Sequence, residues 1–342
     1  MANKRVAING FGRIGRAFLK VAATRKDFDV VAINDLGDLD NLAYLLRYDS
    51  AYGKSNLDIE TRDGKLIVNG HDIVFLSERD PSKLPWKDLA VDLVLESTGV
   101  FDSYEKAKVH LEAGAARVVV SAPVDDEPPV GITGATVLMG VNEEKLKTCD
   151  ISSNASCTTN AGSPVIQILE EGLGIEKAIL NTVHGYTATQ SLVDSPSKKD
   201  YRRGRAAAHN IIPSTTGAAI SVTKAVTSLE GKFDGVALRV PVIVGSIADI
   251  TFIAKRNTTV EEVNDILTKA AEQERWKKVF AVTHDQIVSS DIVGSTYASI
   301  ADLSFTKVVD GNLVKVLSWY DNEVGYTHAL VEHVALSVGY VG

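Results

Sequence analysis

The chain has 342 residues, of which 45% are hydrophobic and 23% are charged, an ordinary composition for a soluble globular enzyme with room for two domains. A net charge of −8 argues against nucleic acid or an anionic membrane surface as the main partner. The two cysteines, Cys149 and Cys157, give no disulfide framework, and no apolar run approaches the ~18 residues of a membrane-spanning helix. Because the N-terminus also lacks a leader pattern, we predict a cytoplasmic protein.

The first third of the chain alternates short apolar runs, glycine turns and helical stretches, which is typical of βαβ units. Between the units, the turns Asp63-Gly64 and Asn69-Gly70 flank two short apolar runs and indicate a small antiparallel excursion. The predicted elements are a helix at residues 12–23 and strands at residues 5–9, 29–35, 65–68, 72–75, 91–96 and 118–121.

A glycine-rich turn, Gly10-Phe11-Gly12-Arg13-Ile14-Gly15, follows the first strand and opens the first helix. In a dinucleotide-binding turn, two glycines let the backbone approach a pyrophosphate, a third lets helix and strand pack closely, and the helix N-terminus attracts phosphate. Asp35 ends the next strand, where a carboxylate accepts hydrogen bonds from ribose hydroxyls, and Asn34 lies beside it. The pattern predicts a dinucleotide site on a Rossmann-type doubly wound, mostly parallel sheet. The alternative for the glycine turn is a tight connection between strand and helix that binds no ligand. NAD is favoured over NADP, because Asp35 would repel a 2′-phosphate.

The second half of the chain has longer alternating runs, which predict an α+β domain with a mostly antiparallel sheet. We expect an NAD-binding domain at residues 1–156, completed by a C-terminal helix at 323–342, and a catalytic domain at 157–322. Residues 194–205 are polar, basic and aperiodic, which favours a functional loop. The predicted elements are a helix at residues 260–273 and strands at residues 177–186, 235–240, 246–254, 299–307 and 313–319.

Cys157 lies among polar residues just before an apolar stretch, in the run Ser153-Asn154-Ala155-Ser156-Cys157-Thr158-Thr159-Asn160. Asn and Ser are helix N-cap types, so Cys157 is expected to open a helix, where free N–H groups and the helix dipole favour a thiolate. Such sites lower a thiol pKa from ~8.5 to ~3.5–7.5. A buried structural cysteine is the alternative, but the polar neighbours make a poor core.

A thiol nucleophile beside a nicotinamide indicates aldehyde oxidation through a thioester, which needs a base. His184, at the end of a predicted strand, is the candidate, with a satisfied core histidine as the alternative. The basic residues at 198–205, the hydroxyls of residues 214–216 with Gly217, and Arg239 fit sites for small phosphates; a solvated charged face is the alternative for the basic run.

With these motifs in place, the chain resembles phosphorylating glyceraldehyde-3-phosphate dehydrogenases over nearly its whole length. The octamer around Cys157 is close to diagnostic. The other matching motifs are residues 8–16, Asn34-Asp35, residues 96–99, residues 121–123, His184 with residues 187–190, residues 202–207, residues 212–219 and residues 319–323.

The resemblance implies that Cys157 attacks the aldehyde of glyceraldehyde 3-phosphate and that His184 acts as the base, in a reaction of glycolysis and gluconeogenesis. It implies NAD as the cofactor, inorganic phosphate as the second substrate, 1,3-bisphosphoglycerate as the product, a homotetramer, and no metal site. The implied cofactor residues beyond the glycine turn, Asn34 and Asp35 are Arg79, Ser97, Thr98, Ser121 and, for the carboxamide, Asn322. The implied ligands of the substrate's own phosphate are Thr187 and Arg239, and those of inorganic phosphate are Ser156, Thr158, Arg203, Thr216 and Gly217.

The chain departs from the family pattern at a few positions, of which residues 242–245 put the contacts just beyond Arg239 in doubt. Three other functions stay open. An erythrose-4-phosphate dehydrogenase shares the Cys157 and nucleotide motifs. An NADP-linked form is opposed by Asp35 and Pro196, with Ser195 weakening the opposition. A catalytically idle binding protein is opposed by the intact Cys157, His184 and Arg239.

Overall fold

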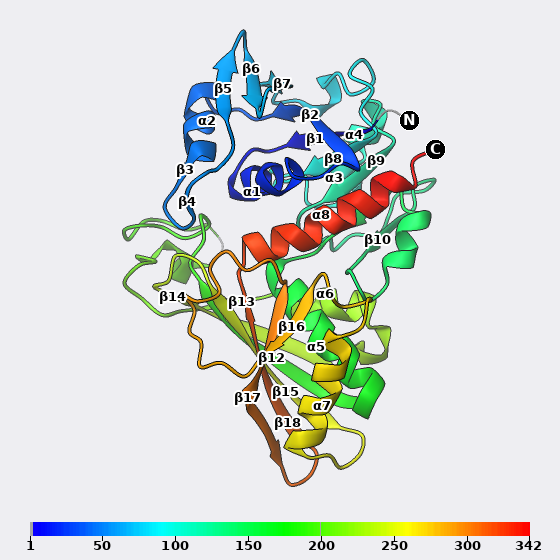
Figure 1. Cartoon of the computed structure of the whole chain (residues 1–342), viewed down its shortest axis with the longest axis vertical. Helices are drawn as coiled ribbons and strands as arrows, with labels where there is room; N and C mark the ends of the chain where they lie inside the picture. Colours follow the sequence, from blue (N-terminus) through cyan, green and yellow to red (C-terminus); the bar gives the residue numbers. More distant parts are fainter. Residues whose placement is uncertain (1–2, 199) are drawn as a thin grey trace. The chain divides into compact units, whose positions relative to one another are not determined.

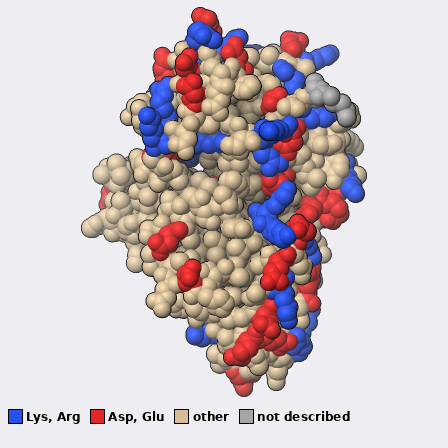
Figure 2. Space-filling model, in the orientation of Figure 1, with Lys and Arg blue, Asp and Glu red and all other residues tan. Residues whose placement is uncertain are grey.

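The computed structural model describes residues 3–198 and 200–342 (Figure 1). Its contacts divide the chain into two compact units, one formed by Met1–Ala155 with Leu330–Gly342 and the other by Ser156–Ala329. Within the described residues, we find no helix with the length and apolar character that crossing a membrane requires. On the face drawn in Figure 2, basic and acidic side chains lie next to one another at the top and along the right-hand side, and a broad area beside them carries few charges.

The first unit is built on one sheet, whose strands follow the order β10-β11-β9-β8-β1-β2-β7-β6-β5 among the described residues. Every pair from β10 to β7 is parallel, and the hairpins β5–β6 and β6–β7 are antiparallel. The mostly parallel sheet and its antiparallel excursion are therefore as predicted. The strands are β1 (Lys4–Asn9), β2 (Phe28–Asn34), β5 (Ile59–Arg62), β6 (Lys65–Val68), β7 (His71–Leu76), β8 (Leu93–Glu96), β9 (Arg117–Val120), β10 (Gly134–Thr136) and β11 (Ile151–Ser153).

The central strands β1, β8 and β9 are apolar because both of their faces are covered. Val6, Ile8, Val94 and Val119, for example, are all fully buried. The remaining elements of this unit are α1 (Arg13–Ala22), α2 (Leu39–Arg47), α3 (Tyr104–Ala107), α4 (Val109–Glu112), the 3-10 turns Pro81–Lys83 and Glu143–Lys147, and the small pair β3 (Tyr48–Asp49) and β4 (Gly53–Lys54).

The second unit is built on a sheet of order β13-β14-β12-β15-β18-β17-β16 in the described chain. It is mostly antiparallel, as predicted, but β12 pairs with β14 and β16 pairs with β17 in parallel. The strands are β12 (Ile175–Gly185), β13 (Ile212–Thr215), β14 (Phe233–Val240), β15 (Ser246–Ala254), β16 (Phe280–Thr283), β17 (Ser299–Val309) and β18 (Leu313–Tyr320). The helices are α5 (Cys157–Leu173), α6 (Ala218–Ala225) and α7 (Val260–Ala271), with 3-10 turns at Tyr201–Gly204 and Thr227–Leu229.

The last helix, α8 (Val324–Gly339), continues across the division between the units, which falls after Ala329. Its C-terminal part is bound into the first unit by polar contacts. His333 Nε2 lies 2.7 Å from Ser152 Oγ and its Nδ1 lies 3.1 Å from Asn154 Oδ1. Arg25 pairs with Glu332, and just beyond the helix Lys4 donates to the carbonyl of Val341.

Candidate active site

Cys157 is the first residue of α5, as the sequence predicts. Ser156 is the N-cap, and its side-chain oxygen accepts a hydrogen bond from the Thr159 N–H at 3.1 Å. The preceding residue, Ala155, is fully buried and has a φ of 54°, a left-handed conformation that non-glycine residues rarely adopt. The Ser153 hydroxyl accepts from the Ala155 N–H at 3.0 Å and supports this turn. The chain therefore bends sharply just before the cysteine.

His184 lies near the end of β12 and places its Nε2 atom 3.3 Å from the Cys157 sulfur. The parallel pairing of β12 with β14 puts Arg239 directly opposite His184. The Arg239 Nη1 atom lies 2.5 Å from His184 Nδ1, and the carbonyl of Gly185 lies 2.6 Å from the same Nδ1. The predicted nucleophile and base are thus in contact, and the predicted phosphate ligand Arg239 touches the base.

Burial lowers the pKa of His184 to about 3, and the charge of Arg239 acts in the same direction. His184 is therefore a neutral base near neutral pH. Burial also raises the pKa of the Cys157 thiol, while Arg239 and hydrogen bonds from Thr158 lower it in part. The predicted fall in the thiol pKa is wrong here, because loss of hydration outweighs the helix N-terminus and the cation.

A fourth side chain at this site, Tyr320 at the end of β18, has no role in the sequence prediction. Its hydroxyl lies 2.8 Å from Thr158 Oγ1 and 2.7 Å from Thr182 Oγ1, and its ring meets the His184 ring edge-on at 5.8 Å. Burial raises the pKa of Tyr320, so its hydroxyl stays protonated. The motif at residues 319–323 pointed to this segment, but only long-range pairing of β15 with β18 brings it to the site.

The predicted phosphate ligands lie on several segments of the second unit. Arg203 donates to Ser214 Oγ from Nε at 3.2 Å and from Nη2 at 2.8 Å. Burial lowers the pKa of Arg239, and the positive charge of Arg203 lowers it further, because the two guanidinium groups repel each other. The Thr187 hydroxyl lies 2.9 Å from that of Thr189.

Thr216 Oγ1 accepts from the Ala218 N–H at 3.1 Å, and Gly217 is the N-cap of α6. Among the described residues, neither Thr216 nor Gly217 is hydrogen-bonded to Arg203 or Arg239. Lys199, in the basic run at 198–205, lies outside the described residues.

A separate cavity of about 370 Å³ lies in the first unit at the glycine turn. Its lining residues lie at or just beyond the C-terminal ends of β1, β2, β7 and β8. Of the predicted cofactor residues, it is lined by Gly10, Gly12, Asn34, Asp35, Arg79, Ser97 and Thr98; its other lining residues are Asn9, Leu36, Glu78, Pro81, Val100 and Phe101.

The glycine turn shows why two of its glycines are required. Gly10 has a φ of 97°, and a Cβ there would lie 2.6 Å from the Thr98 nitrogen. A Cβ on Gly15 would lie 2.2 Å from the Gly10 carbonyl oxygen. At Gly12, the N-cap of α1, a Cβ would meet no atom within 4 Å, and no side chain caps the helix. Open space before uncapped N–H groups is what a pyrophosphate needs, so the turn fits the predicted dinucleotide.

Asp35 keeps acceptor capacity for a ribose. Its Oδ2 accepts from the Phe11 N–H at 2.7 Å and its Oδ1 from the Gly37 N–H at 2.8 Å, which leaves further lone pairs. Asn34 differs, because its two amide N–H groups already donate to Asn9 Oδ1 and the Glu78 carbonyl. The predicted ribose contact of Asn34 would have to use its oxygen, which also accepts from the Glu78 N–H.

The remaining predicted cofactor residues do not line this cavity. Arg13, at the start of α1 beside Ile14, pairs with Asp49 at 3.2 Å, and Ser121 follows β9. Asn322 belongs to the second unit, where its Oδ1 accepts from the Gly245 N–H at 3.1 Å and the Ser246 hydroxyl at 3.0 Å. These two bonds fix the carboxamide and leave its N–H groups to donate elsewhere.

A strand–glycine–helix turn with an acid after the next strand, and a cysteine held against a neutral histidine, define a nucleotide-dependent oxidoreductase with a thiol nucleophile. Family comparisons agree with this class. The family model described as "Glyceraldehyde 3-phosphate dehydrogenase, NAD binding domain" matches residues 4–104, and that described as "Glyceraldehyde 3-phosphate dehydrogenase, C-terminal domain" matches residues 156–322.

Curated relatives named glyceraldehyde-3-phosphate dehydrogenase match along both chains. The protein of Thermotoga maritima is 50% identical over 335 residues, which cover 97% of this chain and 98% of the relative. That of Geobacillus stearothermophilus is 46% identical over 333 residues, covering 97% of each chain. "Glyceraldehyde-3-phosphate dehydrogenase 1" of Kluyveromyces lactis is 45% identical over 335 residues, covering 97% and 99%. The chain belongs to the glyceraldehyde-3-phosphate dehydrogenase family.

Proposed function

We propose that this enzyme oxidises and phosphorylates D-glyceraldehyde 3-phosphate to 1,3-bisphosphoglycerate with NAD, in glycolysis and gluconeogenesis. The observation that carries the proposal is the 3.3 Å contact between the Cys157 sulfur and His184 Nε2 at the start of α5. Residues 1–156 with the C-terminal helix would bind NAD, and residues 157–322 would hold the substrate. We also propose a cytoplasmic enzyme, since the chemistry needs a free thiol.

The Cys157 sulfur attacks the aldehyde carbon while His184 Nε2 accepts the thiol proton. Nδ1 faces both the Gly185 carbonyl, which accepts, and Arg239 Nη1, which can only donate. For this step Arg239 would donate to the Gly185 carbonyl, 3.2 Å away, so that Nδ1 carries the ring proton and the Nε2 lone pair faces the sulfur. The protonated Nε2 keeps this proton and donates a hydrogen bond to the negatively charged oxygen of the thiohemiacetal. When bound, NAD supplies the hydride acceptor that turns the thiohemiacetal into a thioester. Phosphate attacks that thioester carbon, and Cys157 leaves as a thiolate that regains its proton from His184.

Each part of the cofactor would have its own ligands. The N–H groups at the start of α1 would bind the pyrophosphate, Asp35 the adenine ribose, and Asn322 the carboxamide. The remaining contacts would come from Phe11, Arg13, Ile14, Arg79, Ser97, Thr98 and Ser121. Arg239 and Thr187 would bind the substrate's phosphate. Inorganic phosphate would bind Ser156, Thr158, Arg203, Thr216 and Gly217.

A single assay tests the function. NADH formation from glyceraldehyde 3-phosphate should require inorganic phosphate, and erythrose 4-phosphate or NADP should support much slower turnover. Faster turnover of erythrose 4-phosphate would assign the chain to the alternative dehydrogenase. Absence of turnover with every substrate pair would indicate a binding protein.

The two phosphate sites should separate in variants. Thr216→Ala should raise the Michaelis constant for phosphate more than that for glyceraldehyde 3-phosphate, and Arg239→Ala should do the reverse. Removing a charge-assisted partner costs about 1.5–3 kcal/mol, or about ten- to a hundredfold. Since Arg239 also contacts His184, kcat should change in Arg239→Ala as well. Steady-state kinetics at varied phosphate measure both, and equal losses for both ligands in both variants would contradict the two-site assignment.

Preference for NAD should depend on the charge of Asp35. Asp35→Asn removes the charge yet keeps an oxygen that accepts from the Phe11 N–H. Asp35→Gly removes that acceptor as well, so the glycine turn loses a hydrogen bond. Both should improve NADP use relative to NAD by one to two decades, since the relieved repulsion is about 1–3 kcal/mol. Asp35→Gly should in addition weaken NAD itself. An unchanged ratio of kcat/KM values would mean that the carboxylate does not reach the ribose.

We also propose that the enzyme is a homotetramer. Support comes from exposed apolar side chains on neighbouring elements of the second unit, Ile179, Ile220 and Val236, of which each exposes more than half of its surface. Over this unit, the face in Figure 2 also carries wide areas without charged side chains. Sedimentation equilibrium measures the mass, and a monomer at micromolar concentration would refute the proposal.

A further inference from the structure

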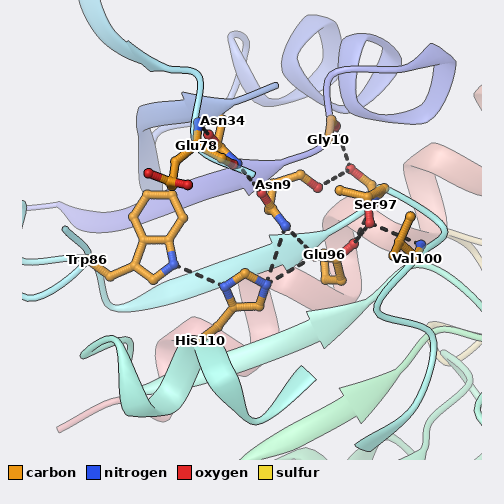
Figure 3. Close-up of polar contacts among 10 residues, drawn as sticks. Asn9, Gly10, Asn34, Glu78, Trp86, Glu96, Ser97, Val100 and His110 are labelled. Atoms are coloured by element: carbon orange, nitrogen blue, oxygen red, sulfur yellow. Dashed lines mark hydrogen bonds and ion pairs between the residues drawn. The ribbon is translucent and has the colours of Figure 1, made fainter. Parts of the chain in front are cut away.

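Glu96, the last residue of β8, carries a buried carboxylate that takes part in no step above. Figure 3 shows it between Asn9, His110 and the turn that begins at Ser97. Its Oε2 accepts from Asn9 Nδ2 at 2.5 Å and lies 3.0 Å from His110 Nε2. Its Oε1 accepts from the Thr98 N–H at 2.8 Å and from the Thr98 hydroxyl. Two groups therefore face each oxygen.

Trp86 decides where the proton of His110 lies. An indole N–H can only donate, and Trp86 Nε1 lies 3.1 Å from His110 Nδ1, so Nδ1 must accept. The ring proton is then on Nε2 and points at Glu96. All four groups around the Glu96 oxygens are consequently donors, which fills the acceptor sites of an ionised carboxylate and would clash with a protonated one.

The same hydrogen-bond chain reaches both walls of the cavity at the glycine turn. On one side, Asn9 Oδ1 accepts from Asn34 Nδ2 at 2.7 Å, and Asn34 pairs with the Glu78 backbone at 3.0 and 2.8 Å. On the other side, the turn after Glu96 is tied to the glycine turn by the Ser97 hydroxyl, which donates to the Gly10 carbonyl at 2.7 Å. Both segments line the cavity, and Figure 3 shows the series of hydrogen-bonded side chains from Trp86 to the segment at Glu78.

We propose that Glu96 is a positioning residue for the adenosine half of the dinucleotide, and that His110 and Trp86 hold its carboxylate with all donors facing it. Glu96 touches no ligand; it fixes Thr98 and Asn9, and through Asn9 and Asn34 the segment at Glu78. This inference rests on the proposed use of NAD. The two fail separately, because a parent enzyme without affinity for NAD refutes the function, whereas the inference is tested by differences among variants.

The test measures the dissociation constants of NAD and of ADP-ribose, which lacks the nicotinamide, by calorimetry on the full-length chain. Glu96→Gln should weaken both ligands about ten- to a hundredfold, because the new amide N–H groups face existing donors and the walls move. Rate at saturating NAD should change much less than affinity. Val119→Ala is the matched control, since Val119 is fully buried on the neighbouring strand β9 but makes no side-chain hydrogen bond. It should lower the unfolding temperature and leave both affinities intact.

The proton arrangement gives a second, sharper readout. Trp86→Phe removes the N–H that holds His110 Nδ1 as an acceptor, so in the double variant His110 can change tautomer and accept at Nε2 from the amide introduced at position 96. Glu96→Gln with Trp86→Phe should therefore bind ADP-ribose at least about threefold more tightly than the product of the single losses predicts. The proposal would be overturned if the loss of ADP-ribose affinity in the double variant equalled the product of the two single losses. It would also be overturned if Glu96→Gln bound ADP-ribose as tightly as the parent does. If Glu96→Gln does not fold, Thr98→Val, which removes one donor, should weaken ADP-ribose several-fold, and unchanged affinity would likewise overturn it.

Discussion

Serine at position 157 is expected to lower dehydrogenase activity by more than about three orders of magnitude, as loss of a nucleophile does in other covalent enzymes. A serine hydroxyl in the same place is far harder to ionise, and the buried, neutral His184 cannot compensate. Affinity for NAD should be preserved, because the glycine turn and its cavity belong to the other unit. The rate of NADH formation and the NAD dissociation constant check the two halves of this prediction.

Cys149→Ser is the matched control, because Cys149 is the other free cysteine and is buried in the first unit. It should keep both the activity and one thiol that iodoacetamide titrates. Turnover of Cys157→Ser within about tenfold of the parent would rule out the thioester route.

Replacing His184 with asparagine is expected to lower kcat by about 10²–10⁴-fold, the usual contribution of a general base. Because its lowered pKa keeps His184 neutral near neutral pH, Nε2 is free to accept the thiol proton at 3.3 Å. Alkylation of Cys157 by iodoacetamide should slow as well, since burial holds the thiol pKa high and no acceptor then remains. Stopped-flow NADH formation and alkylation rates provide the measurement.

His71→Asn serves as a comparison, because His71 is exposed on β7 and lies far along the sequence from this site. It should leave both rates near those of the parent. An alkylation rate that stayed the same in His184→Asn over the pH range would show that the contact with Cys157 has no chemical role.

Local sequence signals predicted the longest strands and helices of the fold, whereas α2, α6, β10, β11 and β13 were among the elements that were not predicted. Asp63-Gly64 and Asn69-Gly70 marked both hairpin turns, and in the structure all four residues have positive φ, as such turns require. Ser156 was recognisable as an N-cap because capping depends on neighbours within one turn of helix. The order of the strands was less accessible. The parallel pairing of β12 with β14 joins segments some fifty residues apart, and only it reveals that Arg239 touches His184.

Burial explains where the prediction for the site failed. The thiol pKa was expected to fall because N-capping residues are visible in the sequence, whereas the desolvation that raises it depends on the whole surrounding core. Tyr320 and Glu96 were likewise unassigned. Their neighbours, Thr158 and Thr182 in one case and Asn9 and His110 in the other, are remote in sequence.

Helix α8 has a consequence for the order in which the protein is made. Ribosomes synthesise a chain from its N-terminus, so residues 3–155 emerge well before residues 330–342. Yet the first unit needs that final segment, in which His333 bonds Ser152 and Asn154 and Glu332 pairs with Arg25. The first unit therefore begins to be synthesised before the second, yet it can be completed only after the entire second unit has been synthesised.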